Sequence, residues 1–184
     1  NCAWYGDKKV TLEQIAGHAR TKHDREIITE LTFASAGLAT SYGAHFAKVQ
    51  VDTETGDVKI LDYAAVHDVG RAINPLSVEG QIEGAVQMGI GYALSEGLEY
   101  DENGKIKNNT FRTYKIAGAL DMPPRIKIAL VEEGEPTGPY GAKSIGECSV
   151  VPCTSAIVNA VSNAVGKCYN DLPLTPARVL EKLK

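Results

Sequence analysis

The feature that most constrains this chain is a turn rich in glycine and proline that leads directly into an apolar helix pattern. Residues 138–147 have the sequence GPYGAKSIGE, and Pro136 lies just before them. This density of glycine and proline predicts an irregular turn whose backbone approaches another surface closely. Glu147 ends the turn, immediately before the predicted helix. Such a carboxylate either stabilises the helix dipole or takes part in acid–base chemistry, and the turn alone does not choose between the two.

A predicted helix from Leu76 to Glu96 contains more glycine than a stable helix normally tolerates. Its glycines are Gly80, Gly84, Gly89 and Gly91. Each costs the helix about 1 kcal/mol relative to alanine. A helix that keeps them has to pack very closely, and the sequence leaves open whether its neighbour is the chain's own sheet or a ligand.

Hydrophobic periodicity and turn residues predict the remaining secondary structure. A hairpin joins residues 44–51 to residues 58–67 through a turn at 52–56. The other predicted elements are a helix over 11–23 capped by Thr11, a strand over 26–34, a loop over 35–43, a second hairpin pairing 98–100 with 105–108, a strand over 125–132, a helix over 152–165 with the core stripe Ala156, Ile157, Ala160, Val161 and Ala164, and a short helix over 176–183. The pattern predicts an α+β fold with two layers, in which two main helices cover a mixed or mostly antiparallel sheet.

Composition narrows the classes of function. The chain has 184 residues, 43% of them hydrophobic and 23% charged, with a net charge of −4; these values are typical of a soluble globular domain. The negative charge and the scattered lysines and arginines argue against a nucleic-acid surface. No apolar run approaches the length of a membrane span, and the first residues show no signal-peptide pattern. We therefore expect a cytoplasmic protein without membrane contact.

The four cysteines and four histidines do not follow a metal-binding pattern. No C-x-x-C occurs, and Cys148 and Cys153 lack the further pair that a plant-type iron–sulfur loop needs. We expect reduced, partly buried cysteines and no metal bound directly by protein side chains. Lys143 does not belong to a phosphate-binding loop, because alanine stands where that loop needs glycine.

Considered together, the glycine-rich segments resemble signatures of the molybdenum hydroxylases, the xanthine dehydrogenase and aldehyde oxidase family. Residues 141–147 resemble that family's G-x-x-x-x-G-E signature, and residues 68–84 resemble its D-x-G-x-x-x-N-P…G-Q-x-x-G segment. Residues 113–116, TYKI, lie between the two as a similar tetrapeptide does in family members. The resemblance covers roughly residues 35 to 167. It indicates a connecting segment, residues 1–34, followed by a C-terminal molybdopterin-binding domain, residues 35–184.

The resemblance implies roles for four residues. Glu147 corresponds to the family's catalytic base, and Gln81 corresponds to a glutamine that hydrogen-bonds the pterin. Gly80 and Gly146 would then let the backbone approach the cofactor closely. In the family, the base deprotonates a hydroxyl on molybdenum, the oxygen attacks an electrophilic carbon, and hydride passes to a sulfide on the metal. The molybdenum is held by its pyranopterin.

The same resemblance implies that this chain works inside a larger enzyme. Family members are several times longer, so we expect a piece of a bigger polypeptide, either a cut fragment or a split subunit, that is inactive in isolation. The expected partners are the rest of the molybdenum-binding chain and the subunits or domains that carry 2Fe–2S clusters and FAD. The electron acceptor and the oligomeric state stay open.

The substrate implied by the resemblance is a small molecule. The run at 138–147 is most similar to bacterial xanthine dehydrogenase-type subunits, which favours hydroxylation of a purine such as xanthine. Cys148 follows the base where many xanthine dehydrogenases have proline and many aldehyde oxidoreductases have serine. An aldehyde or another N-heterocycle therefore remains an alternative substrate. A non-catalytic assembly module of the same lineage, and a free-standing binding protein, are the alternatives from other classes.

Overall fold

The chain folds as two units, Asn1–Ser35 and Ala36–Lys184, in a computed structural model that describes residues 1–32, 34–35 and 37–183. The first unit consists of two short antiparallel strands, β1 (Cys2–Tyr5) and β2 (Lys8–Thr11), and helix α1 (Leu12–His23). Thr11 caps α1 as predicted: its hydroxyl accepts the Gln14 N–H, and the Gln14 side chain accepts the Thr11 N–H. None of the described residues in this unit is buried, so it has no core of its own.

The strand predicted over residues 26–34 is wrong for the residues that the structure describes there, 26–32 and 34. A strand is stabilised by hydrogen bonds to a neighbouring strand, and this stretch belongs to neither of the two described sheets. Apolar alternation alone does not supply such a neighbour. The loop that follows is irregular as predicted through Tyr42, with residue 36 outside the described residues, and Gly43 already belongs to the next strand.

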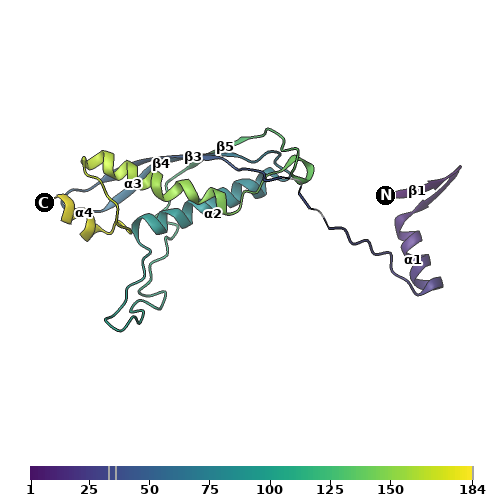
Figure 1. Cartoon of the computed structure of the whole chain (residues 1–184), viewed down its shortest axis with the longest axis horizontal. Helices are drawn as coiled ribbons and strands as arrows, with labels where there is room; N and C mark the ends of the chain where they lie inside the picture. The colour runs from purple at the N-terminus through teal and green to yellow at the C-terminus, as the bar shows by residue number, and fades with distance from the viewer. Residues whose placement is uncertain (33, 36, 184) are drawn as a thin grey trace. The chain divides into compact units, whose positions relative to one another are not determined.

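A mixed sheet with the strand order β3–β4–β5 forms the base of the second unit (Figure 1). Strands β3 (Gly43–Val51) and β4 (Val58–Asp68) form the predicted antiparallel hairpin, and β5 (Ile126–Val131) pairs in parallel with β4. Within β4 the register shifts at Leu61, which has no partner in β3. This bulge lets Ile60 and Tyr63, three residues apart, both enter the core.

Two long helices, α2 (Pro75–Leu94) and α3 (Val151–Val165), pack on each other and cover one face of this sheet (Figure 1). The predicted α+β fold with a mixed sheet and two main helices is confirmed. Asn74 caps α2 by accepting the Ser77 N–H, and Gly166 ends α3 in the left-handed conformation. Helix α2 ends two residues earlier than predicted. Helix α4 (Pro176–Leu183) closes the chain, and its Val179 packs in a second, smaller core beyond α3.

The inner face of α3 is turned slightly from the predicted stripe. Its buried residues are Cys153, Ile157 and Val161, which are spaced by four. Ala156 and Ala160 are half-buried, and Ala164 is exposed. Cys153, which the predicted stripe does not include, is buried in the same core cluster as residues of α2 and the sheet.

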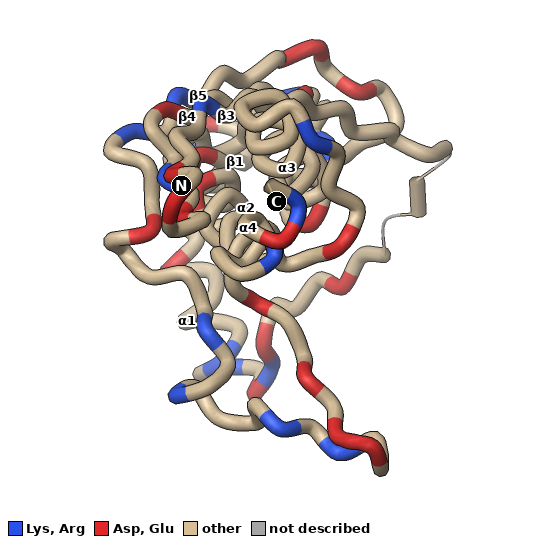
Figure 2. The backbone as a smooth tube through the Cα atoms, turned by 90° about the vertical axis from the view of Figure 1, so that its left-hand side faces the viewer, with Lys and Arg blue, Asp and Glu red and all other residues tan. Residues whose placement is uncertain are grey.

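The segment between α2 and β5 loops away from the sheet and helices (Figure 1), and it carries charges of both signs (Figure 2). The hairpin predicted there is reduced to a single bridge between Tyr100 and Ile106. The Asp101 carboxylate accepts the N–H groups of Asn103 and Lys105 at 2.9 Å each. These bonds hold the turn in place of a longer ladder.

Residues Glu147–Val165 are long and apolar enough to cross a membrane by length and composition alone. The expectation that no stretch reaches this length is therefore wrong for this one. Its fully buried residues are Ser149, just before α3, and Cys153, Ile157 and Val161, which lie on the side of α3 that packs on β3 and α2. In this fold one side of the helix packs on the sheet and on α2, and most residues of the stretch are not buried.

Candidate functional site

The glycine-rich turn and the D-x-G segment, which lie far apart in the sequence, are in direct contact. Gly70 has a φ of +64° and Gly141 a φ of +82°, which is the left-handed region that favours glycine. A Cβ on Gly70 would overlap the Gly141 carbonyl oxygen. The Lys143 N–H donates to the Val69 carbonyl at 2.9 Å, and the Val69 N–H donates to the Val131 carbonyl at 3.0 Å. The turn is therefore attached to the end of the sheet through backbone contacts that only glycine permits.

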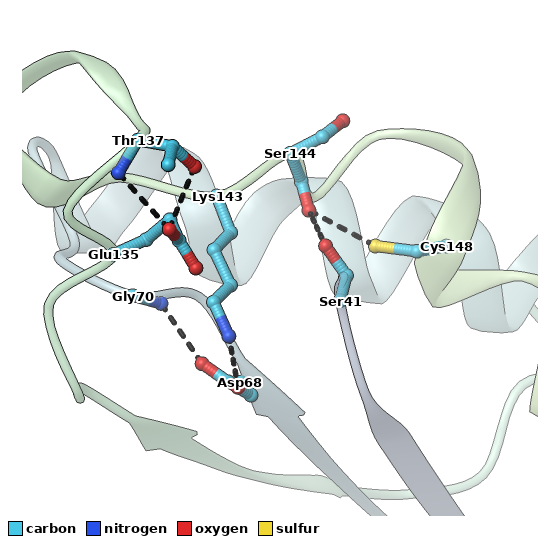
Figure 3. A network of polar contacts seen from close by, with 8 residues as sticks. All are labelled: Ser41, Asp68, Gly70, Glu135, Thr137, Lys143, Ser144 and Cys148. Carbon is cyan, nitrogen blue, oxygen red and sulfur yellow. Dashed lines mark hydrogen bonds and ion pairs between the residues drawn. The ribbon is translucent and has the colours of Figure 1, made fainter. Parts of the chain in front are cut away.

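An ion pair joins the same two segments (Figure 3). Lys143 Nζ lies 2.6 Å from Asp68 Oδ2, and Asp68 Oδ1 accepts the Gly70 N–H at 3.0 Å. Only 10% of the Lys143 side chain and 17% of the Asp68 side chain are exposed. The hydrogen bond from Lys143 lowers the pKa of Asp68, and the same bond raises the pKa of Lys143. Both groups are therefore charged at neutral pH.

Glu135 binds two residues of the turn through its side chain and its backbone. Its carboxylate accepts the Thr137 N–H at 3.0 Å and the Thr137 hydroxyl at 2.7 Å (Figure 3). These bonds lower the pKa of Glu135, so it stays an acceptor. The Glu135 N–H donates to the Gly141 carbonyl at 3.0 Å. The loop between β5 and Lys143 is thus held by its own hydrogen bonds.

Glu147 opens the short 3₁₀ turn η2 (Glu147–Ser149), which leads into α3. Just before it, the Ser144 carbonyl accepts the Ser41 hydroxyl at 2.9 Å and the Cys148 thiol at 3.2 Å (Figure 3). Glu147 itself is exposed, and its carboxylate makes no hydrogen bond or ion pair with the part of the chain that the structure describes. A Cβ on the neighbouring Gly146 would meet nothing within 4 Å. Gly146 and Glu147 are thus exposed, and the backbone just before them is held by the hydrogen bonds to the Ser144 carbonyl.

Gln81 is exposed on α2 and lines a cavity of about 220 Å³ between the start of that helix and the turn. Asn74 and Ser77 line it from the helix side, and Lys143 and Ile145 line it from the turn. Glu147 does not reach its wall, although η2 packs against α2 nearby. The structure therefore brings the D-x-G, G-Q-x-x-G and G-x-x-x-x-G-E segments to one edge of the fold.

The four glycines of α2 have different surroundings. A Cβ on Gly89 would overlap the Cys153 side chain, and one on Gly91 would overlap a side chain just past the helix end. By contrast, a Cβ on Gly80 or Gly84 would meet nothing within 4 Å. Packing of α2 inside this chain explains Gly89 and Gly91 and leaves Gly80 and Gly84 unexplained.

The TYKI segment does not join this edge. The Tyr114 hydroxyl donates to the Glu96 carboxylate at 2.9 Å, and the Lys115 carbonyl accepts the Ser95 hydroxyl at 2.8 Å. At 1.5 Å per residue, these contacts lie about 20 Å along α2 from Gln81. A larger cavity of about 420 Å³ lies beside them and is lined by no residue of the other three motif segments.

A partly buried chain of hydrogen bonds starts on the sheet, and no motif in the sequence predicts it. His67 Nε2 lies 2.7 Å from His45 Nε2, and His45 Nδ1 lies 2.9 Å from the Tyr63 hydroxyl. The Tyr63 hydroxyl donates to Cys153 Sγ at 3.0 Å, and that thiol donates to the Val86 carbonyl at 3.5 Å. The chain crosses from the sheet to α3 and on to α2.

The donors along this chain fix the histidine tautomers. Because the Tyr63 hydroxyl donates to sulfur, His45 Nδ1 has to carry the proton that it shares with Tyr63. His45 Nε2 then accepts from His67 Nε2–H, and His67 Nδ1 is a bare acceptor, buried without a partner in the described chain. Burial, with a contribution from His67, lowers the pKa of His45 to about 4; burial also lowers the pKa of His67 and raises that of Cys153 to about 11. The chain is therefore neutral at pH 7.

One signal in the sequence could have found this chain. His45 and His67 lie on the two strands of the predicted hairpin, where the register places them two residues apart across the pair. The four cysteines are free thiols, with Cys153 buried and Cys168 exposed. Among the described residues, no group of three or more His, Cys, Asp and Glu side chains is arranged to hold a metal ion.

Comparison with known proteins identifies the class of this domain. Residues 2–123 match the family described as the molybdopterin cofactor-binding domain. The putative xanthine dehydrogenase molybdenum-binding subunit of Escherichia coli is 41% identical over 143 residues, which are 77% of this chain and 19% of that subunit. Subunit gamma of the 6-hydroxypseudooxynicotine dehydrogenase complex of Paenarthrobacter nicotinovorans is 30% identical over 184 residues, covering 96% of this chain and 23% of that subunit.

The fold agrees with these relatives. The crystal structure of quinoline 2-oxidoreductase from Pseudomonas putida superposes with a TM-score of 0.72 at 35% identity, covering 76% of this chain and 18% of that one. The chain thus belongs to the family described as the molybdopterin cofactor-binding domain. It belongs to the molybdenum hydroxylase family, as its motifs predict. It spans about a fifth of the length of the relatives that it matches.

Proposed function

We propose that this chain forms one wall of the active site of a molybdenum hydroxylase, with Glu147 as the general base and Gln81 as a ligand of the pterin. The observation that carries the proposal is the meeting of three separate motif segments at one edge, with Gln81, Gly146 and Glu147 exposed there. The rest of the molybdenum-binding chain would supply the opposite wall. Iron–sulfur and FAD groups would lie on other domains or subunits, and we propose a cytoplasmic enzyme.

The residues at this edge fit a flat heterocyclic cofactor. The Gln81 amide offers both a donor and an acceptor to the edge of a pterin ring. Next to it, Gly80 and Gly84 leave bare helix backbone, and the space that a Cβ would take on either has no other atom within 4 Å. A planar ring can lie against such a surface, and a side chain at either position would occupy that space. When bound, the molybdenum cofactor supplies the two-electron oxidation that hydroxylation of a carbon requires.

Glu147 has the properties that a general base needs. Its carboxylate has no partner in the described chain, so it is available to accept a proton. The backbone around it is fixed by Lys143 before it and by Cys153 after it. Burial raises the pKa of the adjacent Cys148 thiol, which donates to the Ser144 carbonyl and does not compete as a base. Gly146 gives the substrate room to approach.

For the substrate, we propose a purine such as xanthine. Identity to the xanthine dehydrogenase subunit of Escherichia coli is 41%, compared with 32% to an aldehyde oxidoreductase subunit of the same organism and 30% to the 6-hydroxypseudooxynicotine dehydrogenase subunit. The 35% identity to quinoline 2-oxidoreductase supports another N-heterocycle as the alternative substrate.

The test uses the full-length enzyme with its partner subunits. Glu147→Gln keeps the size of the side chain and removes the base, so we expect kcat for xanthine to fall by about 10²- to 10⁴-fold while molybdenum content stays at the wild-type level. Gln81→Ala should lower molybdenum content. Glu133→Gln, another exposed carboxylate in the loop after β5, is the matched control and should leave both unchanged.

Two results would count against Glu147 as the base, and a third would count against the proposed substrate. An unchanged rate in Glu147→Gln would remove Glu147 from the chemistry. Loss of molybdenum in the same variant would make Glu147 a structural residue. If the wild-type enzyme hydroxylates quinoline-type heterocycles and not xanthine, the proposed role of Glu147 stands and the proposed purine substrate is wrong.

A further inference from the structure

We infer that the ion pair between Asp68 and Lys143 positions Glu147, so that it sets the turnover rate and leaves substrate binding unaffected. The inference rests on the proposed role of Glu147 as the base. It makes Asp68 and Lys143 positioning residues, because the charged groups of the two side chains bind each other and act on Glu147 only through the backbone of the turn.

The first step is the path from the ion pair to Glu147. Lys143 lies four residues before Glu147 on the same turn, and its partner is the last residue of β4. Both oxygens of Asp68 are used, one by Lys143 Nζ and one by the Gly70 N–H, so the carboxylate has a single orientation (Figure 3). Within the described residues this is the only ion pair between the turn and the sheet. Breaking this ion pair would therefore shift the backbone of the turn that carries Glu147.

The second step is the energetic character of the pair. A second ion pair starts from the same strand: Lys127 Nζ lies 2.5 Å from Asp62 Oδ2, but those side chains are 53% and 42% exposed. Exposed pairs of this kind contribute little to stability. The Lys143 pair is largely removed from water, and the cost of taking charges out of water opposes its Coulomb attraction. The pKa directions show that the pair favours the charged forms of both residues, and because both side chains are mostly covered the pair also imposes a fixed geometry that the exposed pair does not.

The third step is the close packing of the aliphatic part of the Lys143 side chain. The Lys143 Cγ lies 3.0 Å from where a Cβ on Gly70 would stand, so the stem runs along bare backbone. Its ammonium group lies 5.7 Å from the centre of the Tyr42 ring. The Lys143 side chain is therefore confined on several sides. The backbone of the same residue is held as well, because the Lys143 N–H donates to the Val69 carbonyl, so side chain and turn are fixed together.

The experiment compares four variants of the full-length enzyme with its partner subunits. Lys143→Met and Asp68→Asn remove the ion pair, and Lys143→Arg keeps the charge. Lys127→Met breaks the exposed pair between Lys127 of β5 and Asp62 of β4 and serves as the matched control. The measurements are kcat and KM for xanthine, molybdenum content, and hydrogen–deuterium exchange of residues 138–147.

We expect Lys143→Met and Asp68→Asn to lower kcat by about 10- to 100-fold, because small displacements of a reacting group have effects of this size. KM should stay within about twofold of wild type, molybdenum content should be retained, and the amides of residues 142 and 143 should exchange faster. Lys143→Arg should recover most of the lost kcat. Lys127→Met should match wild type in every measurement.

A wild-type kcat in Lys143→Met, or a rise in KM at constant kcat, would overturn the inference. Should Lys143→Met fail to fold, Lys143→Arg decides: loss of molybdenum there would also make the pair structural and overturn the inference. The two proposals fail separately. A collapsed rate in Glu147→Gln with a normal rate in Lys143→Met contradicts only the positioning role, whereas a normal rate in Glu147→Gln contradicts the proposed base.

Discussion

The two halves of α2 contain the same costly residue for different reasons. In the C-terminal half, Gly89 is needed because the side chain of Cys153 on α3 fills the space that a Cβ would take. In the N-terminal half, Gly80 and Gly84 face open space. Each glycine costs about 1 kcal/mol of helix stability. Packing within this chain offsets that cost in one half only, so the other half points to a neighbour from outside the described chain, which we propose is the cofactor.

The packed half also depends on the partly buried hydrogen-bond chain, whereas the open half does not. Cys153 both fills the space at Gly89 and accepts the Tyr63 hydroxyl, and its thiol donates to the Val86 carbonyl of α2. The contact between α2 and α3, which we call the joint, therefore combines close packing and hydrogen bonding at one residue, Cys153. Substitutions and pH should disturb the two halves very differently.

The largest effect on stability is expected from Gly89→Ala. The new Cβ would overlap both the Cβ and the sulfur of Cys153, which are held by the backbone of α3 and cannot move away. We expect the free energy of unfolding to fall by about 2 to 3 kcal/mol, despite the better helix propensity of alanine. Chemical denaturation of the 184-residue chain measures this. A stabilised variant would show that α2 and α3 are not packed as described.

Acid should weaken the same joint by a somewhat smaller amount. The folded-state pKa of His45 is about 4, below its ordinary value of 6.5, so the unfolded chain binds more protons between these two pH values. Stability is then full above pH 6.5 and falls as the pH drops toward 4. A shift of this size corresponds to about 3 kcal/mol for a fully buried group, and the partial exposure of His45 reduces the expected loss to roughly 2 kcal/mol. Denaturation at a series of pH values measures the slope. His45→Gln should flatten it, and His18→Gln, on exposed α1, should not; an equal slope in all three proteins would contradict the neutral chain.

The smallest effect, and one of opposite sign, is expected from Gly84→Ala. Because nothing lies within 4 Å of the new Cβ, the chain should gain up to about 1 kcal/mol in unfolding free energy from helix propensity. The same substitution in the full-length enzyme should lower molybdenum content, since the methyl group would occupy the surface proposed for the pterin. Unchanged molybdenum content would mean that the open half of α2 faces something else.

Elements defined by local signals could be predicted from the sequence. Asn74 and Pro75 mark the start of α2, Gly166 marks the end of α3, and the turn at residues 52–56 marks the β3–β4 hairpin. The resemblance to a family predicted which segments carry the candidate site, and the structure brings three of them to one edge. The strand over 26–34 failed because its hydrogen-bonding partner cannot be read from its own residues.

The contacts that position the site could not be predicted, because they join residues far apart in the sequence. Asp68 and Lys143 are separated by 75 positions, and Tyr63 and Cys153 by 90. Neither pair has a local spacing that indicates it. The bulge at Leu61, which turns Tyr63 into the core, is likewise a property of the paired strands.

The most direct test of the claim that Lys143 positions Glu147 as the general base is a double-mutant cycle in the full-length enzyme. It combines Lys143→Met with Glu147→Gln and measures kcat for xanthine hydroxylation in all four proteins. If Lys143 acts through Glu147, Lys143→Met should lower kcat about 10- to 100-fold in the wild-type background and less than about twofold in the Glu147→Gln background. Losses that simply multiply would contradict this, because the two residues would then act independently.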